Sequence, residues 1–182
     1  YFDRRGFTGP RPMLSMAGAI TEIFLICKVQ IHVFSGMRHS EARHLPYHCM
    51  APENGPHGRK HCLIAGTTTK FNKGRRLRTK WVSTDDGFRA IRLAQQFAAV
   101  IYEALGVTPS TSGDLMDKYP LFPSVQYLPW RSGDTSSDGR IAAFKANLAK
   151  DGDSLLDRLC PVIEEEDIAE LEAIDPFRAW RA

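Results

Sequence analysis

The strongest constraint on the fold is an apolar segment near the start of the chain, residues 17–34. Its large side chains recur every three or four residues, which places them on one face of a helix: Ile20, Ile23, Phe24, Cys27, Ile31 and Phe34. Polar residues such as Glu22 and Lys28 interrupt the segment, whereas a membrane-spanning helix requires about 20 predominantly apolar residues. We therefore predict a core helix, with Ser15 as its N-cap, that does not span a membrane.

The composition agrees with a domain built around such a helix. At 182 residues and 43% hydrophobic content, the chain is long enough for one domain with a sizeable core. The four cysteines have no spacing typical of a disulfide framework, so we expect a reducing cytoplasm and no secretory leader. Because the chain begins with Tyr1 rather than Met, we expect a fragment in which residues 1–14 are an irregular lead-in.

The net charge of +3 is unevenly distributed. No acidic residue lies between Glu53 and Asp85, and that stretch carries eight basic ones: Arg59, Lys60, Lys70, Lys73, Arg75, Arg76, Arg78 and Lys80. Residues 151–175 are acidic instead. A basic middle region favours a polyanionic partner, although a run of charge is also typical of a solvated face.

The basic region has the pattern of a β-hairpin, with a strand over 61–70, a turn over 71–74 and a return strand over 75–83. Since successive side chains of a strand point to opposite faces, one face of the return strand carries a row of cations, namely Arg76, Arg78 and Lys80. Leu77, Thr79 and Trp81 face the other way. The row can meet a polyanion, or it can protect an exposed edge strand from aggregation.

The remaining segments complete an α+β fold that is mainly α-helical with a small antiparallel sheet. Their patterns predict a turn over 51–58 and a helix over 88–105. This helix is preceded by a capping box of Ser83 and Asp86 and ends at Gly106. An irregular connection is expected over 107–139, followed by helices over 141–148, 154–159 and 164–174. We expect Tyr102 to be a packed ring rather than a nucleophile.

Arg38 is the main candidate for chemistry. Ser35 and Gly36 break the first helix, and Arg38 then begins a new helical turn with Glu41 three residues later. Residues at this spacing share a face, so the carboxylate can orient the guanidinium. A fixed guanidinium can grip a phosphodiester by two parallel hydrogen bonds. The alternative is an ordinary surface ion pair.

The segment from Ser35 to Leu45 resembles the first active-site motif of the tyrosine recombinases, or phage integrases. That motif is a small hydroxyl residue, Gly, an apolar residue, Arg, two free positions and Glu, with apolar residues at the next and fourth positions. Arg38, Glu41, Ala42 and Leu45 fall in register with it. The pair Thr69-Lys70 before the hairpin turn is also similar to the Thr-Lys pair of the family, and the resemblance extends over residues 17–122.

The resemblance implies an enzyme that cuts and rejoins double-stranded DNA through a 3′-phosphotyrosyl intermediate, without metal or cofactor. Arg38 would stabilise the transition state and Lys70 would be the general acid, with Glu41 and Lys73 in supporting positions. The family also implies a tetrameric assembly on paired DNA sites and a bacterial or phage origin. Contacts to backbone phosphates are expected from five basic residues: Arg43, Arg75, Arg76, Arg78 and Lys80.

The chain departs from the family in its second half. None of its six histidines is followed by an arginine three residues later, and no tyrosine lies in a suitable terminal context. We therefore expect residues 15–182 to be a partial catalytic domain that cannot cleave DNA alone.

Two other functions remain open from the sequence. The first is a zinc-binding nucleic-acid module that uses two similar clusters, His44/His48/Cys49 and His57/His61/Cys62. These clusters lack the Cys-x-x-Cys spacing of strong zinc sites, and His61 and Cys62 would point to opposite faces of a strand. The second is a non-catalytic DNA-binding protein, whose binding would depend on salt and survive the substitution Arg38→Ala.

Overall fold

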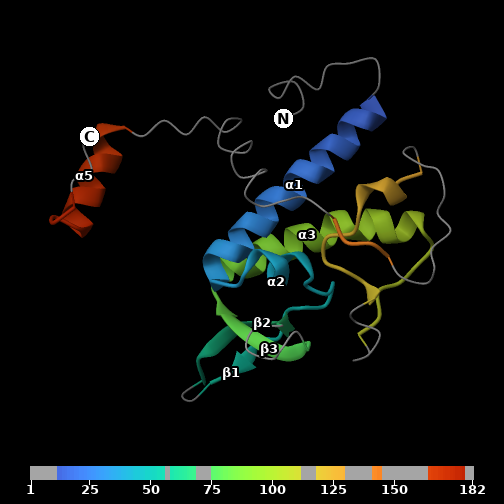
Figure 1. Cartoon of the computed structure of the whole chain (residues 1–182), viewed down its shortest axis with the longest axis horizontal. Helices are drawn as coiled ribbons and strands as arrows, with labels where there is room; N and C mark the ends of the chain where they lie inside the picture. The colour runs from blue at the N-terminus through green and yellow to red at the C-terminus, as the bar shows by residue number, and fades with distance from the viewer. Residues whose placement is uncertain are drawn as a thin grey trace. The chain divides into compact units, whose positions relative to one another are not determined.

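The computed structural model describes residues 12–55, 58–68, 75–111, 118–129, 141–144 and 164–178. The chain divides into two compact units, Tyr1–Leu148 and Ala149–Ala182. The first unit contains α1 (Pro12–Ser35), α2 (His39–Arg43), β1 (Glu53–Asn54), β2 (Lys60–Thr68), β3 (Leu77–Ser83), α3 (Asp85–Ala104) and the 3-10 helix η4 (Val125–Tyr127), as Figure 1 shows. The second unit contains α5 (Glu165–Ile174). The predicted α+β class with a small antiparallel sheet is confirmed.

Helix α1 is the central element of the first unit and packs along α3. Its apolar residues Phe24 and Ile31 are fully buried in one core with residues of α3. The predicted N-cap at Ser15 is wrong, because the helix already begins at Pro12. Proline suits the first helical position, since its backbone angle is preset and its missing N–H would have no helical partner there.

Residues Met16–Ser35 of α1 are long and apolar enough to cross a membrane by length and composition, although half of this window is buried within the protein. Glu22 and Lys28 are 3% and 1% exposed. The Lys28 ammonium lies 5.6 Å from the centroid of the Phe144 ring, a cation–π geometry. In this unit α1 is therefore the predicted core helix, and the charged side chains of Glu22 and Lys28 are buried in the interior of the unit.

The three strands form one antiparallel sheet in the order β1-β2-β3. Strands β2 and β3 pair with Cys62 opposite Ser83 and Thr68 opposite Leu77, which confirms the predicted hairpin. The predicted turn at 71–74 lies outside the described residues. The short strand β1 was not predicted; it forms where Glu53 pairs with His61 in a segment rich in turn residues.

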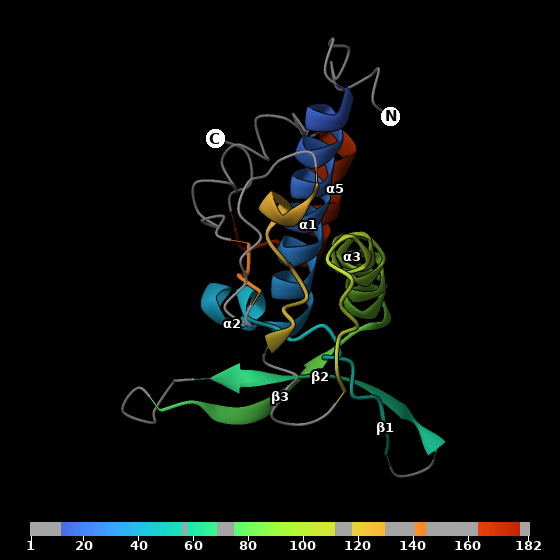
Figure 2. The same ribbon diagram turned by 90° about the vertical axis from the view of Figure 1, so that its right-hand side faces the viewer.

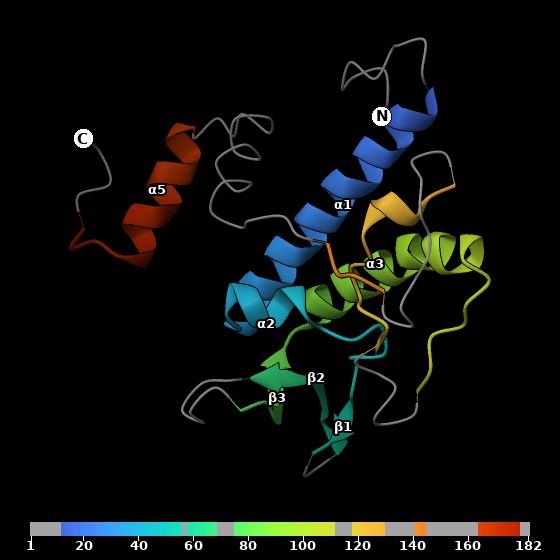
Figure 3. The same ribbon diagram turned by 45° about the vertical axis from the view of Figure 1, so that its right-hand side comes forward.

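One face of the sheet packs beneath the helices, as Figures 2 and 3 show. Ile64 on β2 is fully buried, and Trp81 is its partner on β3. A Cβ atom at Gly66 would lie 3.0 Å from Cδ2 of Leu45 and 3.1 Å from Cζ3 of Trp81, so glycine permits this close approach. The opposite face of the sheet is turned away from the helical layer.

The N-cap of helix α3 lies one residue later than predicted. Thr84 is the N-cap, and its hydroxyl accepts a hydrogen bond from the Gly87 amide at 3.3 Å. Ser83, the predicted cap, belongs to β3 because it pairs with Cys62. The predicted end at Gly106 is confirmed, since this residue has a φ of 64°, which favours glycine.

The described part of the long connection is core structure. Leu121 and Phe122 are buried, and the Leu121 amide donates to the Leu45 carbonyl at 2.7 Å. The predicted helix over 141–148 is wrong in its described part, residues 141–144. There the Phe144 amide donates to the Phe122 carbonyl at 2.8 Å, and this tertiary pairing overrides the local helical preference.

Tyr102 is a packed ring, as predicted. It is buried, and its hydroxyl donates to the Pro120 carbonyl at 2.6 Å. Burial raises the pKa of Tyr102, so the side chain stays neutral.

In the second unit, α5 has the predicted acidic first turn. The Glu164 amide donates to the Asp167 carboxylate at 2.9 Å, and Asp175 ends the helix. The helix predicted over 154–159 lies outside the described residues.

Candidate nucleic-acid interface

The turn between α1 and α2 places Arg38 at the surface. The Gly36 amide donates to the His32 carbonyl at 3.0 Å, and the φ of 63° at Gly36 lets the chain reverse there. Met37 is buried and anchors the turn in the core. Arg38 follows as the N-cap residue of α2, in extended conformation and exposed, so its side chain is accessible to a ligand.

Glu41 contacts the backbone of Arg38 rather than its guanidinium. One carboxylate oxygen accepts the Arg38 amide at 2.7 Å, and the other accepts the Thr68 hydroxyl at 2.6 Å. The predicted contact between Glu41 and the guanidinium is not among the interactions of the described residues, where the carboxylate binds the Arg38 amide and the Thr68 hydroxyl instead. Glu41 instead ties the start of α2 to the end of β2, so the position of Arg38 is coupled to the hairpin.

The strand register separates the hairpin side chains as predicted. Arg78 lies opposite Thr67 and Lys80 opposite Ala65, whereas Trp81 lies opposite the buried Ile64. Arg78 and Lys80 therefore share the face turned away from the helices. Arg75 and Arg76 precede β3 and are exposed. Thus the described basic residues of the hairpin lie on accessible surface.

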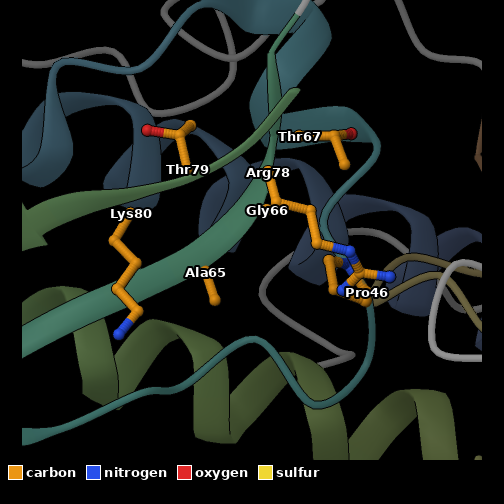
Figure 4. A pocket seen from close by; sticks show the side chains of 7 residues that line it. All are labelled: Pro46, Ala65, Gly66, Thr67, Arg78, Thr79 and Lys80. Atoms are coloured by element: carbon orange, nitrogen blue, oxygen red, sulfur yellow. The ribbon is translucent and has the colours of Figure 1, made fainter. Parts of the chain in front are cut away.

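A pocket of about 300 Å³ lies on this part of the sheet. Figure 4 shows its lining residues, which are Pro46, Ala65, Gly66, Thr67, Arg78, Thr79 and Lys80. The Arg78 side chain extends toward Pro46, and Lys80 projects from the other end of the group. The strand register puts Arg78, Lys80 and Thr67 on the outer face, whereas Thr79 points to the other face. Two cations and one hydroxyl group on the same face suit an oxyanion.

The other predicted basic residues differ in their surroundings. Lys80 forms an ion pair with Glu53 of β1. Arg43 is half-buried, and its Nε has no hydrogen-bond partner in the described part of the chain. Lys70 and Lys73 lie outside the described residues, so their predicted roles stay predictions.

The residues of the zinc alternative are dispersed. Cys49 is buried, and burial raises the pKa of its thiol to about 12. His61 and Cys62 occupy adjacent positions of β2 and therefore opposite faces. Across the described ranges, no three His, Cys, Asp or Glu side chains lie close enough to hold a metal ion, and His57 lies outside them.

Three residues at this interface were not singled out from the sequence. Thr68 binds Glu41, Glu53 binds Lys80, and Pro46 forms one side of the pocket. Thr68 belongs to a run of three threonines before the predicted lysine. That run was the only local sequence signal for any of the three residues, because each of them contacts residues that are distant in the chain.

No protein-family model, curated protein or solved structure matches the chain. The interpretation of this interface therefore depends on the geometry and chemistry of its own residues.

Proposed function

We propose that this chain binds double-stranded DNA through Arg38 and the outer face of the β2–β3 hairpin, as part of a tyrosine-recombinase catalytic domain. The observation that carries the proposal is the strand register, which places Arg78 and Lys80 together on the face away from the helices. The link from Glu41 to Thr68 supports it, because this link couples the helix that bears Arg38 to the same hairpin.

The chemistry of the proposed reaction agrees with an exposed arginine beside a basic hairpin. In the intact parent protein, the oxygen of a deprotonated tyrosine would bond to the scissile phosphorus while the bond to the 5′ oxygen breaks. Arg38 would neutralise charge on the non-bridging oxygens, and Lys70, or Lys73 in its place, would donate the proton to the departing 5′ oxygen. The reaction conserves the phosphodiester energy in the phosphotyrosyl bond, so it needs no metal or nucleotide cofactor. The intact protein would act in the cytoplasm as a tetramer on paired sites.

The hairpin would contribute affinity without reading the sequence. Cationic side chains that contact phosphates release counterions, so each such contact steepens the dependence of affinity on salt. These contacts position the protein on the duplex, whereas base contacts in the grooves give sequence specificity. We therefore expect binding to duplex DNA that is sensitive to salt and weakly selective.

The test is the affinity of the purified chain for a fluorescent DNA duplex, measured by anisotropy between about 50 and 200 mM salt. The double variant Arg76→Gln/Arg78→Gln should weaken binding and reduce the salt slope by about 2, because two phosphate contacts are lost. The matched control is Arg89→Gln/Arg92→Gln, which removes the same charge from exposed positions of α3. Equal losses in the two double variants would show non-specific attraction and contradict the hairpin interface.

Arg38→Ala in the same assay separates the recombinase proposal from a non-catalytic DNA-binding protein. If Arg38 holds a phosphate, its removal weakens binding and lowers the salt slope by about 1. Binding that is unchanged by Arg38→Ala favours the non-catalytic alternative. Because the chain contains no His-x-x-Arg motif, we expect no covalent protein–DNA adduct on denaturing gels.

A further inference from the structure

The ion pair between Glu53 and Lys80 crosses the outer face of the sheet. Glu53 lies on β1, Lys80 lies on β3, and β2 runs between them. The residue of β2 opposite Lys80 is Ala65, whose small side chain leaves room for the lysine to extend over the strand. This pair therefore places a carboxylate beside the pocket that Lys80 and Arg78 line.

The pocket offers the groups that one phosphodiester would need. The guanidinium of Arg78 can donate two parallel hydrogen bonds to the non-bridging oxygens. Lys80 supplies a second positive charge, and Thr67 has a hydroxyl that can donate another hydrogen bond. No acidic residue is among those that line the pocket.

We propose that this pocket is the seat of one DNA backbone phosphate, and that Glu53 competes with this phosphate for the ammonium group of Lys80. The inference rests on the proposed function and names a binding site and a regulating residue within it. DNA that reaches the pocket exchanges the carboxylate partner of Lys80 for a phosphate. Glu53 thereby lowers the affinity for DNA at this position.

The exposure of the pair makes this exchange feasible. The side chains of Lys80 and Glu53 are 49% and 51% exposed, so water solvates both charges and screens their attraction. Such a pair contributes little to stability and can open without disturbing the fold. A phosphate in the pocket can compete with Glu53 for Lys80, because Arg78 and Thr67 lie on the same face of the sheet and offer it further donors.

The test is a double-mutant cycle in the full chain with Glu53→Gln and Lys80→Gln, using the same fluorescent duplex. Glu53→Gln should raise the affinity several-fold and leave the salt slope nearly unchanged, because Lys80 contacts a phosphate in both complexes and only the competing carboxylate is lost. Lys80→Gln should weaken binding more in the Glu53→Gln background than in the wild-type chain. The control Glu103→Gln removes one exposed negative charge from α3, and its effect measures the change in net charge alone.

Thr67→Val tests the seat independently of the ion pair. This substitution keeps the shape of the side chain and removes the hydroxyl, so the affinity should fall about three- to ten-fold while the salt slope stays the same. Circular dichroism of every variant checks that the fold is retained.

The outcomes of the two proposals can be distinguished. If the wild-type chain binds DNA through the hairpin but Glu53→Gln behaves like Glu103→Gln, the competition is overturned and the proposed function stands. If Thr67→Val has no effect on affinity, the phosphate seat is overturned. If neither the wild-type chain nor Glu53→Gln binds the duplex, the proposed function itself fails.

Discussion

The Glu41 carboxylate makes two hydrogen bonds that join separate elements of the first unit. One reaches the amide of Arg38 at the start of α2, and the other comes from the hydroxyl of Thr68 at the end of β2. A charged acceptor with two donors holds both elements more firmly than neutral groups would.

We expect Thr68→Val to lower the free energy of unfolding by about 1–2 kcal/mol, because one oxygen of a half-buried carboxylate loses its protein donor. Urea denaturation followed by circular dichroism measures the loss. Thr67→Val is the matched control, since it makes the same change at the neighbouring position of β2 on the opposite face. An equal loss in both variants would mean that valine at this strand, rather than the missing hydrogen bond, causes the effect.

At the scale of elements, the start of α3 shows how neighbouring residues divide two roles. Thr84 caps the helix by accepting the Gly87 amide, whereas Ser83 ends β3. The Ser83 hydroxyl is buried without a hydrogen-bond partner in the described part of the chain. The Ser83 hydroxyl lies close to Gly87, where a Cβ atom would be only 2.2 Å from it, so glycine leaves the space that this hydroxyl occupies.

The two hydroxyl residues should therefore respond differently to removal. Thr84→Ala should lower the free energy of unfolding by about 1 kcal/mol through loss of the cap. Ser83→Ala should be neutral or stabilising, because it removes a buried polar group that has no partner. Thermal unfolding of both variants measures the difference. A larger loss for Ser83→Ala would restore Ser83 as the cap that the capping-box pattern indicated.

At the scale of the whole molecule, α1 gathers segments that are distant in the chain. The Phe24 ring packs edge-on against Phe122, with ring centroids 5.6 Å apart and an angle of 76° between the planes. Phe144 lies 6.4 Å from Phe24 on a third segment. The connection after α3 thus completes the core of the first unit.

We expect Phe24→Ala to lower the free energy of unfolding by about 3–5 kcal/mol, because a fully buried ring leaves a cavity among these segments. Phe34→Ala is the matched control in the same helix, where the side chain is 37% exposed and a smaller loss is expected. Urea denaturation of the purified chain measures both. If both variants lost a similarly small amount of unfolding free energy, Phe24 would not be buried in the core and the central role of α1 would be contradicted.

Local sequence patterns were enough to predict the elements whose signals lie within a short stretch of the chain. Residues spaced three or four apart predicted α1 and α3, alternation predicted the two faces of β3, and acidic residues at a helix start predicted α5. These patterns can be read over short stretches, because each element forms its backbone hydrogen bonds within itself or across one turn. The Arg38 motif was likewise visible as a local spacing.

The contacts of the charged residues could not be predicted from local patterns and follow from the packing of the elements. The bonds from Thr68 to Glu41 and from Lys80 to Glu53 each join residues 27 positions apart, and no short pattern specifies such pairs. The extended conformation of residues 141–144 likewise depends on Phe122. Contacts at this separation depend on how the elements pack, so the partners of Glu41 and Lys80 became visible only in the folded chain.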